Sequence, residues 1–208
     1  MSESPITFYL FRHGQTDWNV DKRIQGHTNI SLNIKGREEA QTLARDLSDV
    51  PMEVIYSSDL DRALETGQAV ATALNVSLIR TELLREAHFG EAEGLLYLDA
   101  EQRFGEYLWK RFRATDLSLM DIGFPGGETK RQSVARILTF LQTVIEEKRY
   151  VTIGISTHGG VIRNLLHFLG TNKIKHVPIP NCVIYALRFS NREGWSIEGP
   201  LKFSPKSI

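Results

Sequence analysis

The sequence predicts an α/β fold, a three-layer αβα sandwich around a mostly parallel sheet. Short apolar runs typical of buried strands alternate with longer stretches whose apolar residues recur at helical spacing. The last two strand-like runs are separated only by a turn, which adds an antiparallel edge strand. A length of 208 residues fits one core, so residues 1–208 are expected to form a single domain.

The first elements form a strand, a helix and a strand. Residues 6–11 (ITFYLF) are almost continuously apolar, as in a strand covered by helices on both faces. Asn33 is placed to cap a helix whose apolar residues run from Ala40 to Leu47, and a second strand is expected at 54–56. This order is typical of a βαβ unit.

The remaining elements continue the alternation. Asp59 is the expected N-cap of a helix with an apolar stripe from Leu60 to Leu74, which places Arg62 in the first turn. Thr129 and Gln132 have capping-box spacing before another amphipathic helix. A strand at 151–155, a helix from 161 and a hairpin built from 183–189 and 195–197 follow.

Residues 95–128 interrupt this alternation and predict a helical insertion over the active site, resembling a cap. Phe104, Leu108 and Phe112 have helical spacing, and Lys110, Arg111 and Arg113 lie beside them. Long insertions of this kind in α/β domains often form substrate walls.

The composition excludes several classes of protein. The chain has 25 Lys and Arg against 25 Asp and Glu, so no global field favours nucleic acid or an anionic membrane as a partner. The sequence contains no signal-peptide pattern and no membrane-length apolar run, so a cytoplasmic location is expected. Cys182 is the single cysteine, which excludes an intramolecular disulfide, and we expect it to pack in the interior.

Two histidines and two arginines follow or adjoin the ends of predicted strands. Arg12 and His13 follow the first strand, Arg62 comes soon after the second, and His158 follows the strand at 151–155. In doubly wound sheets ligands bind beyond the carboxyl ends of the strands. Guanidinium groups pair with the oxygens of a phosphate dianion and with the charge that develops during phosphoryl transfer, which needs no metal.

Other residues near these strand ends have expected roles. Gly14 is expected to let the backbone approach the ligand, and Asn19 and Gln25 are candidate donors. A neutral imidazole can accept a phosphoryl group, and the leaving alkoxide then needs a proton. The segment 84–94 offers three carboxyls for this purpose, and spacing alone does not choose among Glu86, Glu91 and Glu93.

At this point five ordered motifs resemble the histidine phosphatase superfamily, in the branch of cofactor-dependent phosphoglycerate mutases and broad-specificity phosphatases. The motifs span nearly the whole chain and are FRHGQTDWN (11–19), RIQG (23–26), SSDLDRALET (57–66), LREAHFGEAEG (84–94) and STHG (156–159).

The resemblance implies a role for each residue at the predicted site. His13 would be the phosphohistidine nucleophile, and Glu86 would be the proton donor and later the base that activates water. It implies a catalytic phosphate pocket of Arg12, Arg62 and His158, and phosphate or substrate contacts from Asn19, Gln25, Gly26 and Gly159. It also implies that neither a metal nor another cofactor is needed.

The motifs do not decide between phosphatase and mutase. Mutases of this branch typically continue the second His-Gly with Asn-Ser, whereas this chain has Gly160-Val161, and its 125–128 motif also resembles phosphatases. Segments 88–90 and 109–111 are similar to mutases. We therefore predict a phosphatase acting on a small phosphorylated metabolite, with phosphoglycerate mutase as the alternative.

Three further expectations concern specificity and the rival classes of function. The hypothesis for Lys110, Arg111 and Arg113 is that they favour acidic phosphoesters. A metal-dependent hydrolase is disfavoured because no metal-ligand spacing such as H-x-x-x-H is present, and a non-catalytic phosphate-binding module is disfavoured because His13, Glu86 and His158 are all present. Either a monomer or a homodimer is compatible with the sequence.

Overall fold

A computed structural model describes residues 5–114, 117–170 and 179–202. Its sheet has six strands in the order β3-β2-β4-β1-β5-β6. The strands are β1 (Ile6–Arg12), β2 (Val54–Ser58), β3 (Ser77–Thr81), β4 (Thr152–Thr157), β5 (Ile184–Ser190) and β6 (Gly194–Leu201). The helices are α1 (Asp17–Val20), α2 (Ile34–Asp46), α3 (Asp61–Leu74), α4 (Tyr97–Phe104), α5 (Glu106–Arg113), α6 (Lys130–Glu147) and α7 (Gly159–Leu169), with single 3-10 turns η1 (Glu82–Leu84), η2 (Gly90–Ala92) and η3 (Leu117–Leu119).

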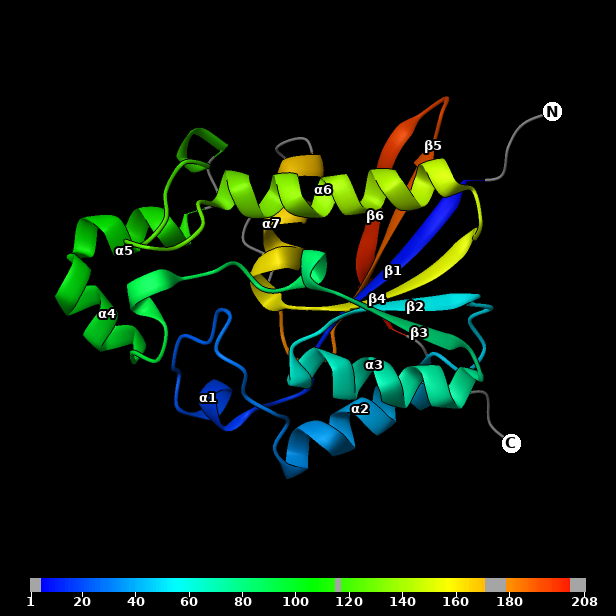
Figure 1. The fold of residues 1–208 in the computed structure, drawn as a ribbon, viewed down its shortest axis with the longest axis horizontal. Coiled ribbons are helices and arrows are strands. Elements are labelled where there is room, and N and C mark those ends of the chain that lie inside the picture. Colours follow the sequence, from blue (N-terminus) through cyan, green and yellow to red (C-terminus); the bar gives the residue numbers. More distant parts are fainter. Residues whose placement is uncertain (1–4, 115–116, 171–178, 203–208) are drawn as a thin grey trace.

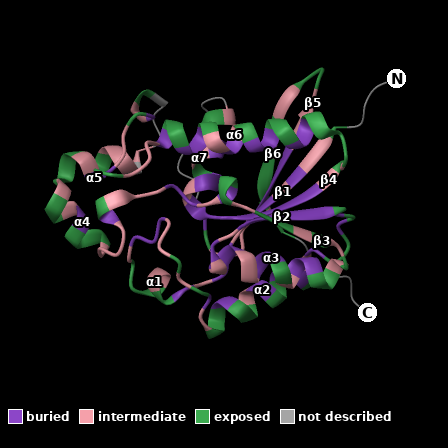
Figure 2. Ribbon diagram, viewed as in Figure 1, coloured by how far each residue is buried: buried purple, intermediate pink, exposed green. Residues whose placement is uncertain are grey.

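The sheet lies between two helical layers, which confirms the predicted sandwich (Figure 1). Apolar residues of α6 and α7 form one core cluster with one face of the sheet, and those of α2 and α3 form a second with the other face. The central strands are accordingly buried along their length (Figure 2). Strands β1 to β4 are parallel, β5 runs antiparallel to β1, and β6 completes the edge as a hairpin with β5.

The strand order positions the predicted site. Strand β4 lies between β1 and β2, with Arg12 opposite Thr157 and Ser57 opposite Ser156. The carboxyl ends of three parallel strands are therefore adjacent, and each leads into a loop or helix at the same edge. This is the crevice where doubly wound sheets bind ligands.

Some helix ends follow the sequence prediction and one does not. Asn33 accepts a hydrogen bond from the Gly36 N–H, and Thr129 forms the predicted capping box with Gln132. The prediction that Asp59 caps the next helix is wrong. Helix α3 begins at Asp61, its N-cap position is Leu60 without a side-chain bond, and the carboxylate of Asp59 instead pairs with Arg85 at 2.7 and 2.5 Å. A nearby guanidinium offers this carboxylate a stronger, charge-assisted partner than a backbone N–H.

Strand β3 was not predicted from the sequence. Its five residues alternate poorly in polarity and are exposed or half-buried, as expected of an edge strand that pairs only with β2. Cys182, in contrast, packs as predicted against the cluster formed with α2 and α3, and burial raises the pKa of its thiol to about 12.

The described part of the insertion at 95–128, called the cap below, is helical as expected and contains the short helices α4 and α5 and the turn η3. Gly105 at φ 84° ends α4 and begins α5, so the predicted spacing of Phe104, Leu108 and Phe112 spans a break. These side chains pack against a third apolar cluster centred on Trp109 and Phe124. The cap lies at the end of the molecule away from both chain ends (Figure 1).

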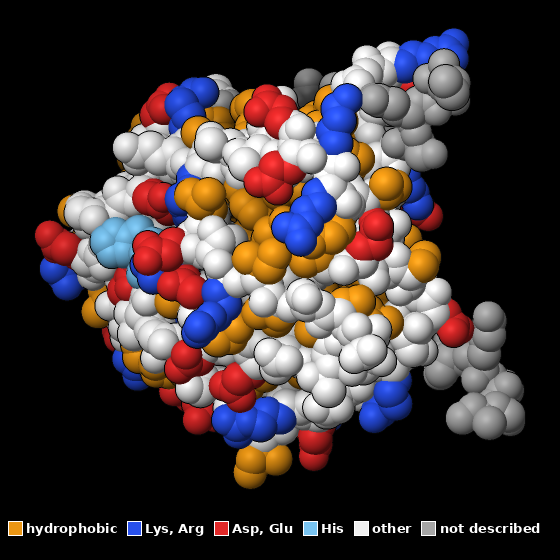
Figure 3. Space-filling model, turned by 45° about the vertical axis from the view of Figure 1, so that its right-hand side comes forward, with side chains coloured by type: hydrophobic (Ala, Val, Ile, Leu, Met, Phe, Trp, Pro, Cys, Tyr) orange, Lys and Arg blue, Asp and Glu red, His pale blue; other side chains and the backbone are white. Residues whose placement is uncertain are grey.

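One face of the molecule carries charges of both signs. Basic and acidic side chains are interspersed on the face shown in Figure 3, in agreement with the zero net charge. Among the described residues, no helix combines the length and the hydropathy that spanning a membrane would require.

Candidate active site

The structure brings together the histidines and arginines predicted from the strand ends. His13 follows β1, His158 occupies the N-cap position of α7 after β4, and Arg62 lies in the first turn of α3. The two imidazole rings are 5.2 Å apart between centroids. All three side chains are buried, with relative exposures of 3% for His13 and 0% for His158 and Arg62.

His13 presents one ring nitrogen with a free lone pair. Its Nδ1 lies 2.7 Å from the carbonyl oxygen of Gly14, and because a carbonyl only accepts, Nδ1 carries the hydrogen and Nε2 does not. Burial lowers the pKa of His13 well below its ordinary value, and the charges of Arg12 and Arg62 add to this. The imidazole is therefore neutral near pH 7, with Nε2 as its nucleophilic atom.

His158 is held by the end of the neighbouring strand. Its Nε2 lies 2.8 Å from the hydroxyl oxygen of Ser58, whereas its Nδ1 is buried without a hydrogen-bond partner among the described residues. Burial lowers the pKa of His158 as well, followed by the influence of Arg62 and His13. A hydroxyl that donates to Nε2 leaves Nδ1–H as a donor.

The two arginines, Arg62 buried and Arg12 half-buried, are cations with unused donors. Arg62 donates to the carbonyls of Gly26 (2.7 Å) and Thr28 (3.0 Å), and Arg12 donates to Ile179 (2.6 Å). In both side chains Nε has no partner within the described part of the chain. Burial lowers the pKa of Arg62 to about 10, and it also lowers that of Arg12. Buried cations with unmet donors are suited to an anion.

The three carboxyls that spacing left open, Glu86, Glu91 and Glu93, have different surroundings. Glu86 lines the pocket and accepts backbone N–H bonds from Ala87 (3.1 Å), Gly160 (2.9 Å) and Val161 (3.1 Å), the last two in the first turn of α7. A Cβ atom at Gly160 would lie 2.4 Å from Oε1 of Glu86. The absence of a side chain at 160 therefore lets the carboxylate bind this helix end.

The other two carboxyls serve different purposes. Glu91 is 55% exposed and pairs with Arg103 at the surface. Glu93 accepts bonds from the backbone N–H groups of His27, Thr28 and Phe89 and from the Thr28 hydroxyl, at 2.8 to 3.0 Å. Both of its carboxylate oxygens therefore accept hydrogen bonds from the protein, and these bonds hold the loop after β1 against the segment 84–94.

These residues line a pocket of about 440 Å³ at the strand ends. Its polar floor includes Arg12, His13, Arg62 and Glu86. Asn19, Gln25, Gly26 and Gly159 also line it, whereas His158 lies buried beside His13. Apolar side chains of the cap form the opposite wall, among them Tyr97, Trp109, Phe112 and Met120.

Gly14 has a different role from the one predicted. It does not line the pocket, and a Cβ atom there would lie 2.3 Å from the carbonyl oxygen of Gly36 in α2. The small residue therefore permits close packing of the loop after β1 on a helix, and not close approach to a ligand.

Two of the three basic residues expected to favour acidic phosphoesters lie away from the pocket. Neither Lys110 nor Arg111 lines the pocket, because Lys110 pairs with Glu106 at the surface and Arg111 with the hydroxyl of Tyr107. The side chain of Arg113 lies outside the described residues. The cations that line the pocket outside its floor are Arg23, Lys130 and Arg163.

Sequence reasoning missed several residues that support the site. Asn181 donates to the carbonyl of His13 (2.9 Å) and to the side chain of Asn19 (3.2 Å), and Thr66 accepts from the Gly14 N–H (3.0 Å). Ser58 and Thr66 lie within a quoted motif, so their places in it were a usable signal. Asn181 had none, because its contacts bridge about 160 residues of sequence.

The described residues contain no group of three or more His, Cys, Asp and Glu side chains arranged to hold a metal ion. The charged groups that face the pocket are mainly cationic, which is the arrangement expected for an anionic ligand.

Fold and pocket together define a doubly wound α/β protein with a mainly cationic pocket at its strand ends. Comparison with known proteins places it further: residues 8–199 match the histidine phosphatase superfamily (branch 1), and the chain belongs to this family. Its predicted resemblance is thereby confirmed.

Relatives within the family carry names of both activities. The chain is 35% identical to phosphoglycerate mutase-like protein 4 of Arabidopsis thaliana, over 91% of this chain and 82% of that protein. It is 33% identical to a metal-independent phosphoserine phosphatase of the same plant, over 77% and 68%. Bacterial proteins named 2,3-bisphosphoglycerate-dependent phosphoglycerate mutase match as well. Among solved structures, Bacillus stearothermophilus YhfR is similar with a TM-score of 0.82 and 28% identity, covering 95% of this chain and 98% of that one.

Proposed function

We propose that this chain is a metal-independent phosphatase that hydrolyses small phosphomonoesters through a phosphohistidine at His13. The observation that carries the proposal is the neutral, buried imidazole of His13, whose Nε2 is left unprotonated near the guanidinium groups of Arg12 and Arg62, both of which have unused donors. Nucleophile and anion-binding groups are thus preorganised in one place. The proposed substrate is a small phosphorylated metabolite, and the proposed location is cytoplasmic.

In the first step the phosphoryl group is bound by Arg12, Arg62 and His158, with Asn19 and Gln25 at its rim. Nε2 of His13 attacks phosphorus, the bond to the ester oxygen breaks, and the leaving oxygen takes a proton from the carboxyl of Glu86. Charge that spreads over the three equatorial oxygens is stabilised by the fixed cations. The products of this step are the free alcohol and a phosphohistidine.

In the second step a water molecule replaces the alcohol. The carboxylate of Glu86 removes a proton from this water as it attacks phosphorus, the bond to Nε2 breaks, and orthophosphate leaves. Glu86 is thereby protonated again, and His13 returns to its neutral form. The cycle consumes one ester and one water molecule, and it needs no metal and no second cofactor.

The role of Glu86 can be tested with esters that differ in leaving group. Glu86→Gln should lower kcat/KM for an alkyl phosphate roughly 100-fold or more, because its alkoxide needs a proton, and affect p-nitrophenyl phosphate far less. Glu91→Gln is the matched control and should leave both values unchanged. An alkyl phosphatase that tolerated Glu86→Gln but lost its activity with Glu91→Gln would contradict the assignment.

A phosphoglycerate mutase is the second candidate, because relatives with that name match this chain. The same phosphohistidine can return its phosphoryl group to a phosphoglycerate. The surroundings of Glu86 support the phosphatase: the mutase-type Asn at position 160 would require Glu86 to move, since even a Cβ atom there would lie 2.4 Å from its carboxylate.

One assay separates the candidates. The purified protein, with excess chelator, is incubated with a panel of phosphomonoesters that includes 3-phosphoglycerate, and orthophosphate and 2-phosphoglycerate are both measured. We expect phosphate release from one or a few esters. Isomerisation stimulated by a bisphosphoglycerate with little phosphate release would identify a mutase. Loss of activity on chelation would identify a metal enzyme, and tight phosphate binding without turnover of any ester would identify a binding module.

A further inference from the structure

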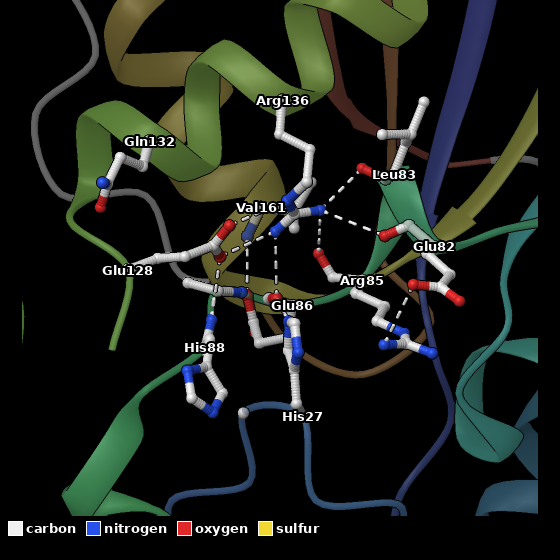
Figure 4. Close-up of polar contacts among 12 residues, drawn as sticks. His27, Glu82, Leu83, Arg85, Glu86, His88, Glu128, Gln132, Arg136 and Val161 are labelled. Carbon is white, nitrogen blue, oxygen red and sulfur yellow. Dashed lines mark hydrogen bonds and ion pairs between the residues drawn. The ribbon is translucent and has the colours of Figure 1, made fainter. Parts of the chain in front are cut away.

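An arginine outside the pocket holds the segment that carries Glu86. Arg136 lies on α6, and its guanidinium reaches the backbone between η1 and Glu86 (Figure 4). The side chain is only 17% exposed. It does not line the pocket, and nothing in the sequence pattern of α6 marks it, because it occupies an ordinary polar position of an amphipathic helix.

The guanidinium serves four carbonyl groups of one short segment. Nη1 donates to the carbonyls of Leu83 (2.7 Å) and Arg85 (3.0 Å) and, more weakly, to Glu82 (3.4 Å), and Nη2 donates to the carbonyl of Glu86 (3.2 Å). The intervening carbonyl of Leu84 accepts from the hydroxyl of Thr157 (2.9 Å). Every carbonyl from 82 to 86 therefore has a partner that fixes it, and most of them depend on Arg136.

A carboxylate fixes the guanidinium in turn. Glu128 receives Nε and Nη2 of Arg136 in a two-pronged pair at 3.0 and 2.9 Å. Glu128 also accepts the backbone N–H of His88 (3.0 Å), and its own backbone N–H donates to the carbonyl of His88 (2.7 Å). Arg136 and Glu128 together therefore form hydrogen bonds with the backbone on both sides of Glu86 and Ala87.

The backbone of Glu86 is held from one side and its side chain from the other. Its carbonyl accepts bonds from Arg136 and from His27 Nε2 (2.8 Å), while its carboxylate accepts the N–H groups of Gly160 and Val161. Figure 4 shows these groups converging on Glu86 from α6, α7 and the loop after β1. A displacement of about 1 Å of a reacting group can cost on the order of 100-fold in rate.

We propose that Arg136, locked by Glu128, is a positioning residue that places the carboxyl of Glu86 for proton transfer to the leaving group. The inference rests on the proposed function, because the donor role of Glu86 is part of it. Arg136 does not touch the substrate. Its contribution is therefore confined to the steps in which Glu86 takes part.

The test compares two esters in the intact chain. Arg136→Ala should lower kcat/KM for glycerol phosphate at least roughly tenfold, and lower it less than about threefold for p-nitrophenyl phosphate, whose leaving group needs no proton. The parameter kcat/KM is chosen because it reports the transfer to His13 and not the later hydrolysis. Arg131→Ala is the matched control. Arg131 also lies on α6 and forms a two-pronged pair, with Asp121 at 2.7 and 3.0 Å. Its side chain is 56% exposed, and these contacts do not involve the segment 82–88.

Two further variants keep the test decisive. Arg136→Lys retains the charge but loses the planar guanidinium that donates to several carbonyls. It should show a smaller loss of kcat/KM, again larger for glycerol phosphate than for p-nitrophenyl phosphate. This variant is informative even if Arg136→Ala does not fold. In the Glu86→Gln background, Arg136→Ala should cause less than about a twofold additional loss with glycerol phosphate, because residues that act through one another are not additive.

The outcomes separate this inference from the proposed function. Equal losses with both esters in Arg136→Ala and Arg136→Lys, or no loss with either, would overturn the positioning role while leaving the phosphatase intact. If Glu86→Gln itself showed no split between the esters, the donor assignment would fail, and the inference would fail with it. A split in Glu86→Gln and Arg136→Ala but not in Arg131→Ala is the expected result.

Discussion

The floor of the pocket, taken here as Arg12, His13, Arg62 and Glu86 with His158 buried beside them, and the cap above it are held by different kinds of interaction. The floor side chains are buried, or half-buried in the case of Arg12, and are fixed by backbone carbonyls and N–H groups, and several of their polar atoms have no partner among the described residues. The cap is held by aromatic packing around Trp109 and Phe124, and its helices carry exposed residues such as Leu98 and Tyr107.

This difference matches the two parts of a phosphomonoester. Directed donors and buried charge suit the phosphoryl group, which is the same in every substrate. Apolar packing is undirected and tolerates changes of shape, so the cap is suited to the alcohol, which varies. The contrast predicts that floor variants lose chemistry, whereas cap variants lose stability or selectivity.

The largest expected effect is in the floor. His13→Ala should reduce phosphate release on the order of 10⁴-fold, because it removes Nε2 of His13, the proposed acceptor of the phosphoryl group. Trp109→Phe in the cap should retain activity within about tenfold. Acid-labile phosphate trapped on the protein during turnover should be present in the parent chain and absent in His13→Ala. Near-normal turnover by His13→Ala would remove the basis of the mechanism.

The next effect is on cap stability. Phe124 is 3% exposed and packs on Phe112 and Phe104, at 4.5 and 5.1 Å between ring centroids, without lining the pocket. Phe124→Ala should lower the free energy of unfolding in urea by about 3 kcal/mol, and Phe124→Leu by about 1 kcal/mol. Orthophosphate affinity, measured by calorimetry under folded conditions, should change less than about twofold. A large loss of affinity would show that floor and cap are coupled.

A smaller effect concerns selectivity at the boundary of the two regions. Arg163 on α7 lines the pocket, and its side chain makes no hydrogen bond or ion pair with another described residue. Arg163→Ala should raise KM for 3-phosphoglycerate by about tenfold and for glycerol phosphate by less than about twofold, since only the first has a carboxylate to pair with it. Lys110→Ala, in the cap, should change neither value. Equal changes in KM for the two esters would show that Arg163 does not pair with the carboxylate of 3-phosphoglycerate.

The smallest effect is a pH dependence of the free energy of unfolding, caused by the two histidines of the floor. Burial lowers the pKa of both His13 and His158 in the folded chain, so below about pH 6.5 the unfolded chain binds protons that the folded chain does not. Stability should therefore fall as the pH falls below 6.5, by about 1 kcal/mol per pH unit for each histidine. Urea midpoints in phosphate-free buffer should show this slope, reduced in His13→Gln and unchanged in Trp109→Phe. An unchanged slope in His13→Gln would contradict the assigned protonation state.

Several parts of the fold could be predicted because they depend on neighbours in sequence. The buried strands β1 and β4 are nearly continuous apolar runs, and the caps at Asn33 and Thr129 involve partners three residues away. The edge strand β3 has neither a continuous apolar run nor a local cap. Asp59 does not cap α3 because it pairs with Arg85, which is distant in sequence. Local patterns predict an element well until a distant residue offers a better interaction.

The sequence by itself determined the class of fold, the set of residues at the strand ends and the resemblance to the histidine phosphatases. Only the tertiary structure decided that Glu86 faces the pocket while Glu93 holds a loop, that Arg163 and not Lys110 lines it, and that Arg136 grips the segment of Glu86. The reason is physical: the contacts of Glu86 with Gly160 and Arg136 span 74 and 50 residues. Such contacts depend on how the helices pack against the sheet, whereas periodicity and capping are set within a few residues of chain.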